Sequence, residues 1–362
     1  MDINLSEKDI LGALSTVLDP DIRRDLVSLN MIRDVRIQGN TISFTVVLTT
    51  PACPLKEQIR QDCVRAVRRV AGPNARVDVN ITSSVTTVRN NAPLLPGVKN
   101  IVPIASGKGG VGKSTVTTNL AVALAQAGAR VGLIDADIFG PSIPTMFNCE
   151  FEQPSVRNVN GRNIIVPIEQ YGVKLISIGF LTPPDSAVIW RGPMASSALK
   201  QFFAEADWGE LDYLLIDLPP GTSDIHLTLV QTVPVTGAVI VTTPQKVAVA
   251  DANKAVAMFR QPQINVPVLG IVENMAWFTP EELPDNRYYI FGRDGGKNLS
   301  EKYGVPLLGQ IPLVQGVRES GDSGLPSVLK EGPAQAAFTA LAESLARQIA
   351  IRNAQTPVAA TT

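Results

Sequence analysis

A glycine-rich segment in the first half of the chain contains residue types that could hold phosphate oxygens. Glycines let the backbone turn its amide groups toward an anion, and a helix that starts after them adds a positive end. The segment fits the pattern G-x-x-x-x-G-K-[ST], in which we expect Lys113 to contact the β- and γ-phosphates, Ser114 to bind Mg²⁺ and Thr115 to contact the α-phosphate. It therefore predicts a site for ATP and Mg²⁺. Its residues are Gly107, Lys108, Gly109, Gly110, Val111, Gly112, Lys113, Ser114 and Thr115.

A second lysine, Lys108, occupies a position of this loop that the general pattern leaves open. A lysine there resembles the deviant Walker A ATPases, in which it crosses a dimer interface to the partner's nucleotide. A second cation at the γ-phosphate would neutralise charge in the transition state. The resemblance implies a homodimer with ATP between its subunits. The alternative is a solvated lysine on a loop.

Carboxylates follow two of the predicted strands. Asp137 comes after the apolar run 131–134 and is our candidate for orienting the attacking water. Asp217 ends the run 214–216 and is expected to bind Mg²⁺, with the Gly221 backbone able to contact a γ-phosphate. An isolated Asp at a strand end is often only a helix cap. Carboxylates in this order after the glycine-rich loop favour ATP hydrolysis, with Lys108, Lys113, Asp137 and Asp217 as catalytic candidates.

The elements that must position these residues alternate in type. From residue 99 onward short apolar runs alternate with helical patterns, which predicts an α/β fold of the P-loop NTPase type, with a mainly parallel sheet flanked by helices. A helical stripe at Phe338, Leu341, Leu345 and Ile349 predicts a closing helix. The predicted strands are 101–105, 131–134, 173–178, 214–216, 238–241, 268–272 and 307–309.

The amino-terminal part predicts a separate small α+β domain over residues 1–89. Ser6 and Asp9 have the spacing of a capping box, and Gln38–Asn40 indicates the turn of a β-hairpin. A second helix and a third strand complete the order α-β-β-α-β. Prolines, a glycine and amides predict a linker over 90–98, which leaves an ATPase domain at 99–352 and a flexible tail at 353–362.

The bulk composition limits the partners and the compartment. Among 362 residues, 32 Lys plus Arg face 33 Asp plus Glu, so no general attraction to nucleic acid or to anionic membrane arises, and we expect neither as a partner. The sequence lacks an apolar run long enough to span a membrane and a signal-peptide pattern. A single histidine excludes a His-rich zinc site, and three cysteines without regular spacing suit a reducing compartment. We therefore expect a cytoplasmic protein.

Four segments together carry a family resemblance: Gly107–Thr115, Asp135–Ser142, Asp217–Gly221 and Val272–Met275. They look like the Mrp/ApbC family of iron–sulfur carrier ATPases, and the resemblance covers nearly the whole chain. Residues 1–88 resemble the small iron–sulfur assembly domain often fused ahead of that ATPase, through Asp19–Asp21 and Thr49–Pro54. The resemblance implies that Asn274 and Pro312 frame the adenine.

One departure from that family concerns the cluster itself. Its members usually carry Cys-x-x-Cys after the Glu-Asn-Met strand, where two subunits together supply four thiolates to a bridging cluster. Residues 276–286 of this chain contain no cysteine. Because thiolates hold most iron–sulfur clusters, the usual binding site is absent. Tyr289–Gly292 and Gly295–Gly296 again resemble the family, which indicates a local replacement.

The remaining thiols offer one candidate contact with a cluster. Cys53 precedes a predicted helix start, where the helix dipole would favour a thiolate, and the alternative is a small apolar residue under a turn. Cys63 lies on the apolar stripe of that helix and predicts core packing, and Cys149 receives no role. His226 is expected on a helix surface.

These observations favour an ATP-hydrolysing iron–sulfur cluster carrier or assembly factor that transfers clusters to apoproteins. The cofactors would be ATP and Mg²⁺, with an iron–sulfur cluster as a further candidate, and the partners client apoproteins or assembly proteins. Two alternatives stay open: a nucleotide-gated positioning switch, and an ATP-dependent docking scaffold that binds no cluster.

Overall fold

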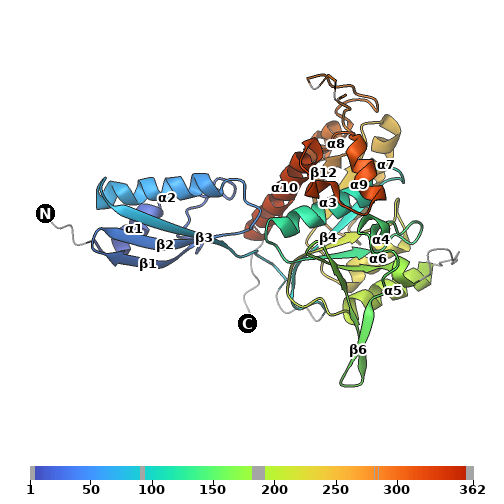
Figure 1. The fold of residues 1–362 in the computed structure, drawn as a ribbon, viewed down its shortest axis with the longest axis horizontal. Coiled ribbons are helices and arrows are strands. Elements are labelled where there is room, and N and C mark those ends of the chain that lie inside the picture. The colour runs from blue at the N-terminus through green and yellow to red at the C-terminus, as the bar shows by residue number, and fades with distance from the viewer. Residues whose placement is uncertain (1–4, 90–93, 182–191, 281, 284, 356–362) are drawn as a thin grey trace. The chain divides into compact units, whose positions relative to one another are not determined.

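The structure is a computed structural model that describes residues 5–89, 94–181, 192–280, 282–283 and 285–355. The chain divides into two compact units (Figure 1). The first contains residues up to 86 together with those from 346, and the second contains residues 87–345. Residues 90–93 of the predicted linker and 356–362 of the predicted tail lie outside the described residues.

The first unit follows the predicted order α-β-β-α-β. The Ser6 hydroxyl accepts a hydrogen bond from the Asp9 amide in the predicted capping box of α1, and strands β1 and β2 form the predicted antiparallel hairpin. β2 pairs in parallel with β3. The elements are α1 (Glu7–Leu14), β1 (Ile32–Gln38), β2 (Thr41–Leu48), α2 (Lys56–Ala71) and β3 (Arg76–Ser83).

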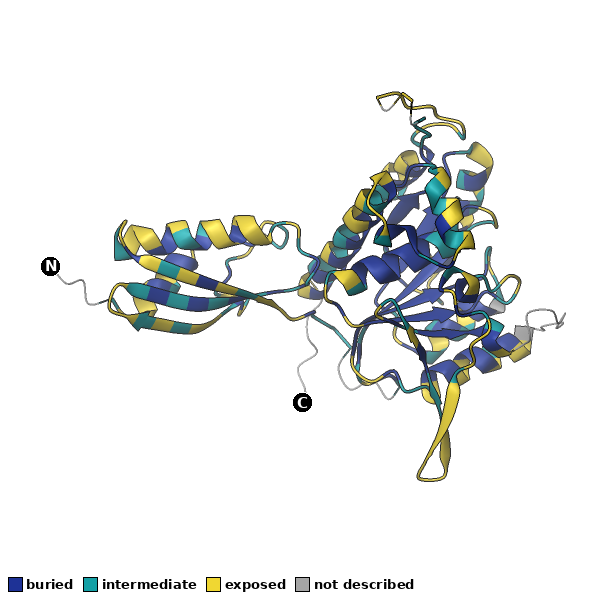
Figure 2. Cartoon of the chain, viewed as in Figure 1, coloured by how far each residue is buried: buried dark blue, intermediate teal, exposed yellow. Residues whose placement is uncertain are grey.

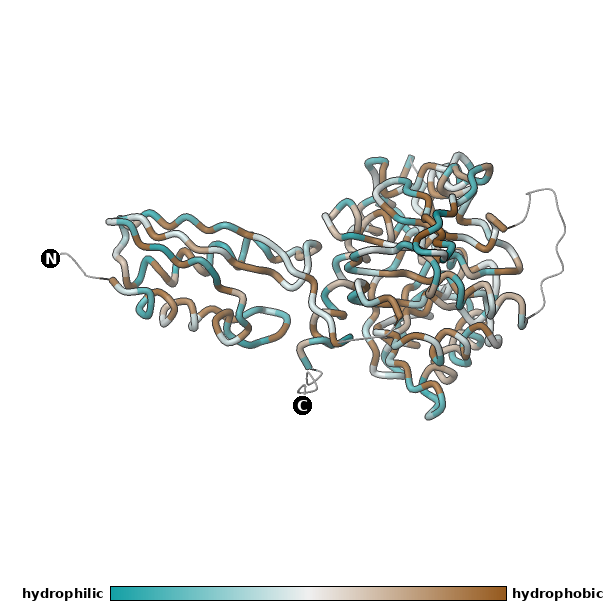
Figure 3. Tube along the Cα trace, turned by 90° about the horizontal axis from the view of Figure 1, so that it is seen from below, coloured by the Kyte–Doolittle hydropathy of each residue, from teal (hydrophilic) through white to brown (hydrophobic). Residues whose placement is uncertain are grey.

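Alternation along β2 builds the core of this unit. Buried Ile42, Phe44 and Val46 alternate with less buried neighbours, as expected for a strand with one face against helices. Ile10 of α1 and Ile59 of α2 belong to the same apolar core. Hydrophobic and hydrophilic residues accordingly alternate along the strands of this unit (Figure 3).

The second unit is built on an eight-stranded sheet in the order β13-β12-β11-β4-β10-β5-β9-β8. All neighbouring pairs are parallel except β8 and β9. The predicted α/β class and mainly parallel sheet are therefore confirmed. The strands of this sheet are β4 (Val98–Ser106), β5 (Val131–Asp135), β8 (Ile168–Gln170), β9 (Val173–Ser177), β10 (Leu211–Asp217), β11 (Ala238–Thr242), β12 (Val268–Glu273) and β13 (Leu307–Gln310).

Helices cover the sheet, whose central strands are buried (Figure 2). The closing stripe predicted from Phe338, Leu341, Leu345 and Ile349 is buried in α10. No helix in the described part of the chain is both long and apolar enough to cross a membrane. The helices are α3 (Lys113–Gln126), α4 (Ile143–Met146), α5 (Gly192–Ala204), α6 (Asp224–Thr232), α7 (Lys246–Arg260), α8 (Gly295–Tyr303), α9 (Gln315–Asp322) and α10 (Pro333–Gln355), with 3₁₀ turns at Ile178–Leu181 and Ser327–Leu329.

Three strands between residues 155 and 170 were not predicted. β6 (Ser155–Val159) and β7 (Arg162–Val166) form an antiparallel hairpin, and β8 adds an antiparallel edge to the main sheet. β6 is exposed along its whole length, so it shows no alternation between core and solvent. The signal that could have predicted this hairpin is Asn160–Gly161, because both residues have the positive φ that a tight hairpin turn needs.

Candidate active site

The glycine-rich loop joins the end of β4 to the start of α3, as predicted. Gly110 and Gly112 have φ values of 81° and 80°, which favour glycine. A Cβ atom at Gly107 would lie 2.1 Å from the backbone carbon of Asp251, and one at Gly112 would lie 2.2 Å from Nδ2 of Asn274. Close packing as well as backbone conformation therefore requires glycine in this loop.

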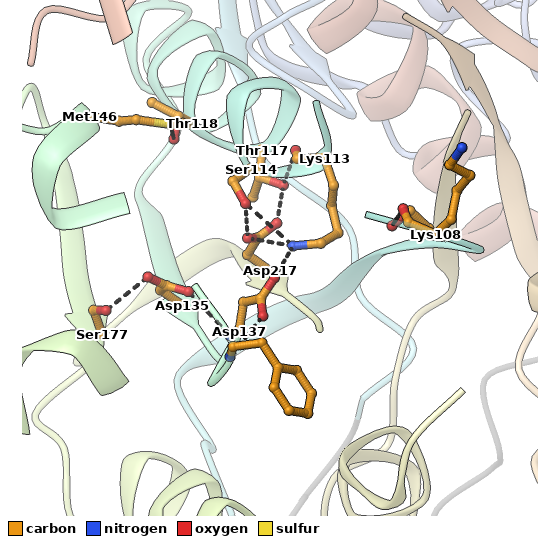
Figure 4. Close-up of polar contacts among 12 residues, drawn as sticks. Lys108, Lys113, Ser114, Thr117, Thr118, Asp135, Asp137, Met146, Ser177 and Asp217 are labelled. Carbon is orange, nitrogen blue, oxygen red and sulfur yellow. Dashed lines mark hydrogen bonds and ion pairs between the residues drawn. The ribbon is translucent and has the colours of Figure 1, made fainter. Parts of the chain in front are cut away.

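Lys113 is buried at the first position of α3 and faces two carboxylates (Figure 4). Its Nζ atom lies 2.7 Å from Oδ2 of Asp217 and 3.2 Å from Oδ2 of Asp137. Burial alone would lower the pKa of Lys113, but the two carboxylates raise it overall. The ammonium group therefore stays charged, and it is positioned to exchange its carboxylate partners for phosphate oxygens.

The Asp217 carboxylate interacts with two hydroxyl groups of α3. The Ser114 hydroxyl donates to Oδ2 of Asp217 at 2.6 Å, and the Thr117 hydroxyl lies 2.7 Å from Oδ1. A carboxylate beside a hydroxyl is the oxygen ligand set that suits Mg²⁺ in nucleotide sites. Ser114 and Asp217, the two predicted Mg²⁺ ligands, thus lie together. Thr117 was missed, although its place one turn after Lys113 could have indicated it.

Asp135 lies beside Asp217 because their strands are aligned in register. It is fully buried, and its oxygens accept hydrogen bonds from the Ser177 hydroxyl at 2.8 Å and the Asp137 amide at 3.2 Å. Burial, with the nearby Asp217, raises the pKa of Asp135 to about 8. Burial also raises the pKa of Asp137, although Lys113 opposes that shift. Asp135 therefore fixes the backbone of the predicted water-orienting residue, a role that sequence reasoning did not assign.

Lys108 and Gly221, two of the predicted site residues, do not face the Lys113–Asp217 ion pair or an open phosphate site. The half-buried Lys108 side chain points away from Lys113 and the carboxylates (Figure 4). The Gly221 amide, which was expected to face a γ-phosphate, donates to the Ser106 carbonyl at 2.9 Å. Contact of that amide with a phosphate thus requires the Gly221–Ser106 hydrogen bond to break.

A pocket of about 410 Å³ opens beside the loop, and Thr115, Asn274 and Pro312 all line it. Nδ2 of Asn274 donates to the Val111 carbonyl at 2.9 Å, which ties this wall to the glycine-rich loop. Sequence reasoning missed the contribution of α4 and α9, because short helices give weak periodic signals. The lining residues are Gly112, Thr115, Ser142, Thr145, Met146, Asn274, Met275, Pro312, Leu313, Val314, Val317, Arg318, Gly321 and Asp322.

Glu273 joins the elements that carry Asn274 and Pro312. It is fully buried at the end of β12 and accepts hydrogen bonds from Nε2 of Gln310 at 2.7 Å and from the Gly296 amide. The carboxylate thereby joins the strand before Asn274 to the strand before Pro312 and to the start of α8. No sequence signal distinguished Glu273 from its neighbours in the motif.

The segment that replaces Cys-x-x-Cys is held by backbone and aromatic contacts. Phe278 and Tyr288 exchange two backbone hydrogen bonds of 2.8 Å, and the Leu313 amide donates to the Trp277 carbonyl. The Arg287 guanidinium lies 4.3 Å from the centre of the Trp277 ring. Positions 281 and 284 of this segment lie outside the described residues.

The cysteines differ in accessibility. Cys63 and Cys149 are buried, and burial raises the pKa of both thiols to about 12. The predicted core packing of Cys63 is confirmed. Cys53 is half-buried, and α2 begins three residues later at Lys56. Within the residues that the structure describes, no three or more His, Cys, Asp or Glu side chains gather where they could bind a metal ion.

The prediction for His226 was wrong. We expected it on a helix surface, but it is fully buried in α6. Its neighbours Ile225 and Leu229 are buried as well, so the inner face of α6 includes position 226. Burial lowers the pKa of His226 to about 4.

Comparisons with known proteins agree with this geometry. The chain is 49% identical over 351 residues to an iron–sulfur cluster carrier protein of Synechocystis sp., covering 96% of this chain and 99% of that protein. It is 50% identical over 348 residues to an iron–sulfur cluster carrier protein of Deinococcus radiodurans, covering 95% of each. A nucleotide-binding protein of Archaeoglobus fulgidus, solved in complex with ADP, has a TM-score of 0.56 and 38% identity, covering 66% of this chain and 91% of that chain.

Family descriptions match both parts of the chain. Residues 7–81 match the family described as iron–sulfur cluster assembly protein. Residues 97–349, more than half of the chain, match the family described as NUBPL iron-transfer P-loop NTPase. The resemblance to iron–sulfur carrier ATPases is thereby confirmed, and the chain belongs to the NUBPL family of iron-transfer P-loop NTPases.

Proposed function

We propose that this protein is an ATP-hydrolysing iron–sulfur cluster carrier or assembly factor that acts in the cytoplasm. The observation that carries the ATP part is the arrangement of Lys113 and Ser114 around Asp217, whose Oδ2 atom lies 2.7 Å from Nζ of Lys113 and 2.6 Å from Oγ of Ser114. Similarity to iron–sulfur cluster carriers over 95–96% of the chain supports the cluster part.

Each residue of the site would have a distinct role in binding or hydrolysing ATP. The amides of the glycine-rich loop and Lys113 would bind the phosphates, and Asn274 and Pro312 would frame the adenine in the adjoining pocket. Ser114 and Asp217 would hold Mg²⁺, which when bound neutralises charge on the phosphate oxygens. Asp137, placed by Lys113 and the Asp135 side chain, would orient a water molecule. Its attack on the γ-phosphorus breaks the bond to the bridging oxygen and releases ADP and phosphate.

Lys108 supports a homodimer as the hydrolysing species. Its side chain points away from the Lys113 cluster of its own subunit (Figure 4). Lys108 would therefore complete the γ-phosphate site of a second copy. There its charge would act as an arginine finger does in other nucleotide hydrolases.

The cluster is the cargo of this reaction, and Cys53 is our candidate for its thiol contact. Cys63 and Cys149 are buried with raised pKa values, so neither offers a thiolate near neutral pH. Cys53 lies in the small unit that matches the assembly-protein family. One thiol per subunit would hold a cluster between two subunits together with thiols of the client apoprotein.

The lack of a paired cysteine motif favours one other candidate, an ATP-dependent scaffold that docks clients and binds no cluster itself. Anaerobic reconstitution with iron and sulfide separates the two. We expect the wild-type chain to gain visible absorption and to load an apo-ferredoxin. Cys53→Ser should lose both properties, whereas the matched control Cys149→Ser should keep them.

The result decides between the candidates. A wild-type chain that hydrolyses ATP but takes up no iron would favour the scaffold. If Cys53→Ser holds and transfers a cluster as well as the wild type does, the role of Cys53 is wrong.

A further inference from the structure

The turn after Asp217 ends at a buried histidine that the proposed reaction does not use. His226 is fully buried at the third position of α6 and forms a capping box with Ser223, the residue before the helix. The Ser223 amide donates to Nδ1 of His226 at 3.2 Å, and the His226 amide donates to the Ser223 carbonyl at 3.0 Å. Ring and backbone thus fix the end of the turn together.

The contacts of Nδ1 suit the neutral tautomer of His226 that has its hydrogen on Nε2. The Ser223 amide can only donate, so Nδ1 accepts from it, and the Ser223 hydroxyl at 3.2 Å can donate to the same atom, while the Ser223 carbonyl oxygen lies 3.3 Å away. Nε2 is buried, and no hydrogen-bond partner for it exists in the described part of the chain. An unpaired buried N–H group destabilises a fold. A leucine at this site would avoid the destabilisation caused by the unpaired Nε2–H group. The favourable contribution of the histidine is the hydrogen bond that Nδ1 accepts from the Ser223 amide.

The other end of the same turn is joined to the glycine-rich loop. The Gly221 amide donates to the Ser106 carbonyl at 2.9 Å, and the Ser106 hydroxyl donates to the Lys108 carbonyl at 3.0 Å. Residues 218–223 therefore connect three parts of the site: Asp217 before the turn, the loop backbone beside it, and His226 after it. Any displacement of Ser223 would move the Gly221 amide relative to that loop.

We propose that His226 is a positioning residue for ATP hydrolysis, which holds Ser223 so that the turn of residues 218–223 keeps Asp217 and the Gly221 backbone aligned with the glycine-rich loop. This inference rests on the proposed ATP hydrolysis. His226 acts through Ser223 and touches none of the reacting atoms. Its loss should therefore slow the chemical step more than it weakens nucleotide binding.

Two substitutions at this position separate the hydrogen bond from the packing. His226→Leu fills a similar volume without an acceptor, whereas His226→Gln offers an amide oxygen that can accept from the Ser223 amide. We expect kcat of the full-length H226L chain to fall by about 10- to 100-fold. KM for ATP and Kd for ADP should change by less than about threefold, and H226Q should keep kcat within about threefold of wild type.

The chain offers a matched control, because α1 has a capping box of the same kind. Ser6→Ala removes that box far along the chain from Asp217, so it should lower the melting temperature and leave kcat unchanged. If H226L does not fold, His226→Met removes the acceptor with a flexible side chain that adapts to the same space, and it should lower kcat without changing Kd for ADP.

Three results would overturn the inference: wild-type kcat in the folded apolar variant (H226L or H226M), an equal loss of kcat in H226Q and in that variant, or the same loss of kcat in S6A. The first shows that the box is irrelevant to catalysis, the second that only the ring's packing matters, and the third that any lost cap slows the enzyme. A wild-type chain that releases no phosphate would instead remove the proposed function on which the inference rests.

Discussion

The ammonium group of Lys113 lies 2.7 Å from the carboxylate of Asp217, within the loop expected to bind phosphate. Both side chains are buried, so neither charge is stable there without the other. When a nucleotide binds, its phosphates must therefore replace Asp217 as the partner of Lys113. The Asp217 carboxylate can then bind a cation such as Mg²⁺. Binding of the nucleotide and binding of the metal ion are linked through this one ion pair.

Two neighbouring aspartates should respond differently to loss of charge. Asp137→Asn should lower kcat by about 100-fold or more while ATP still binds, because an amide cannot accept a proton from the attacking water. Asp135→Asn should keep kcat within about fivefold, because its pKa of about 8 leaves this carboxyl largely protonated at neutral pH. Phosphate release by both full-length variants is the measurement. Equal inactivity of the two variants would show that Asp135 must be charged.

Lys108 can be tested by mixing subunits. Lys108→Ala should bind ATP but lose about 100-fold in kcat, and Lys113→Ala should bind ATP about 100-fold or more weakly than the wild type does. In a mixed dimer, the nucleotide bound by the K108A subunit would receive Lys108 from the K113A subunit. An equal mixture should therefore recover about a quarter of wild-type activity, since half of the dimers each regain one of two sites. If the mixture stays as inactive as its components, Lys108 does not act between subunits.

The buried His226 should make the fold less stable in acid. Burial lowers its pKa from 6.5 to about 4, so only the unfolded chain takes up a proton between these values. The contribution of His226 to stability is complete above pH 6.5 and falls as the pH drops toward 4. At pH 5 the loss is about 2 kcal/mol.

His226→Gln isolates this effect, because glutamine does not titrate. Both chains retain Asp135, whose raised pKa has the opposite effect: it reduces stability as the pH rises from about 4 to 8. Because this effect is the same in both chains, it cancels in the comparison. Chemical unfolding of wild type and H226Q at pH 7.5 and pH 5 gives the difference directly. A loss on acidification of the same size in both chains would show that His226 is not held neutral.

Local patterns predicted much of this molecule. The glycine-rich loop and Asp217 belong to a motif whose chemistry sets its spacing, and seven strands of the main sheet gave apolar runs because both sheet faces are covered. The capping box at Ser6 and the hairpin turn at Gly39 are likewise short-range signals, and the structure confirms them.

The remaining features depend on contacts between segments far apart in sequence. Glu273 acquires its role from Gln310 and Gly296, which are brought to it only by folding. His226 lies on the inner face of α6, and single-residue polarity misled the prediction because its Nδ1 atom is satisfied locally by Ser223. β6 is exposed along its whole length and β7 is at most half-buried, so periodicity could not indicate the hairpin.

Titration calorimetry with a non-hydrolysable ATP analogue and Mg²⁺ tests the central claim, that Lys113 and its carboxylates form the phosphate site. We predict that Lys113→Ala weakens binding by about 100-fold or more. Lys99→Ala is the control, because Lys99 forms a similar ion pair of 2.9 Å with Asp212 away from the site and should leave binding unchanged. Wild-type affinity in a folded K113A chain would contradict the account.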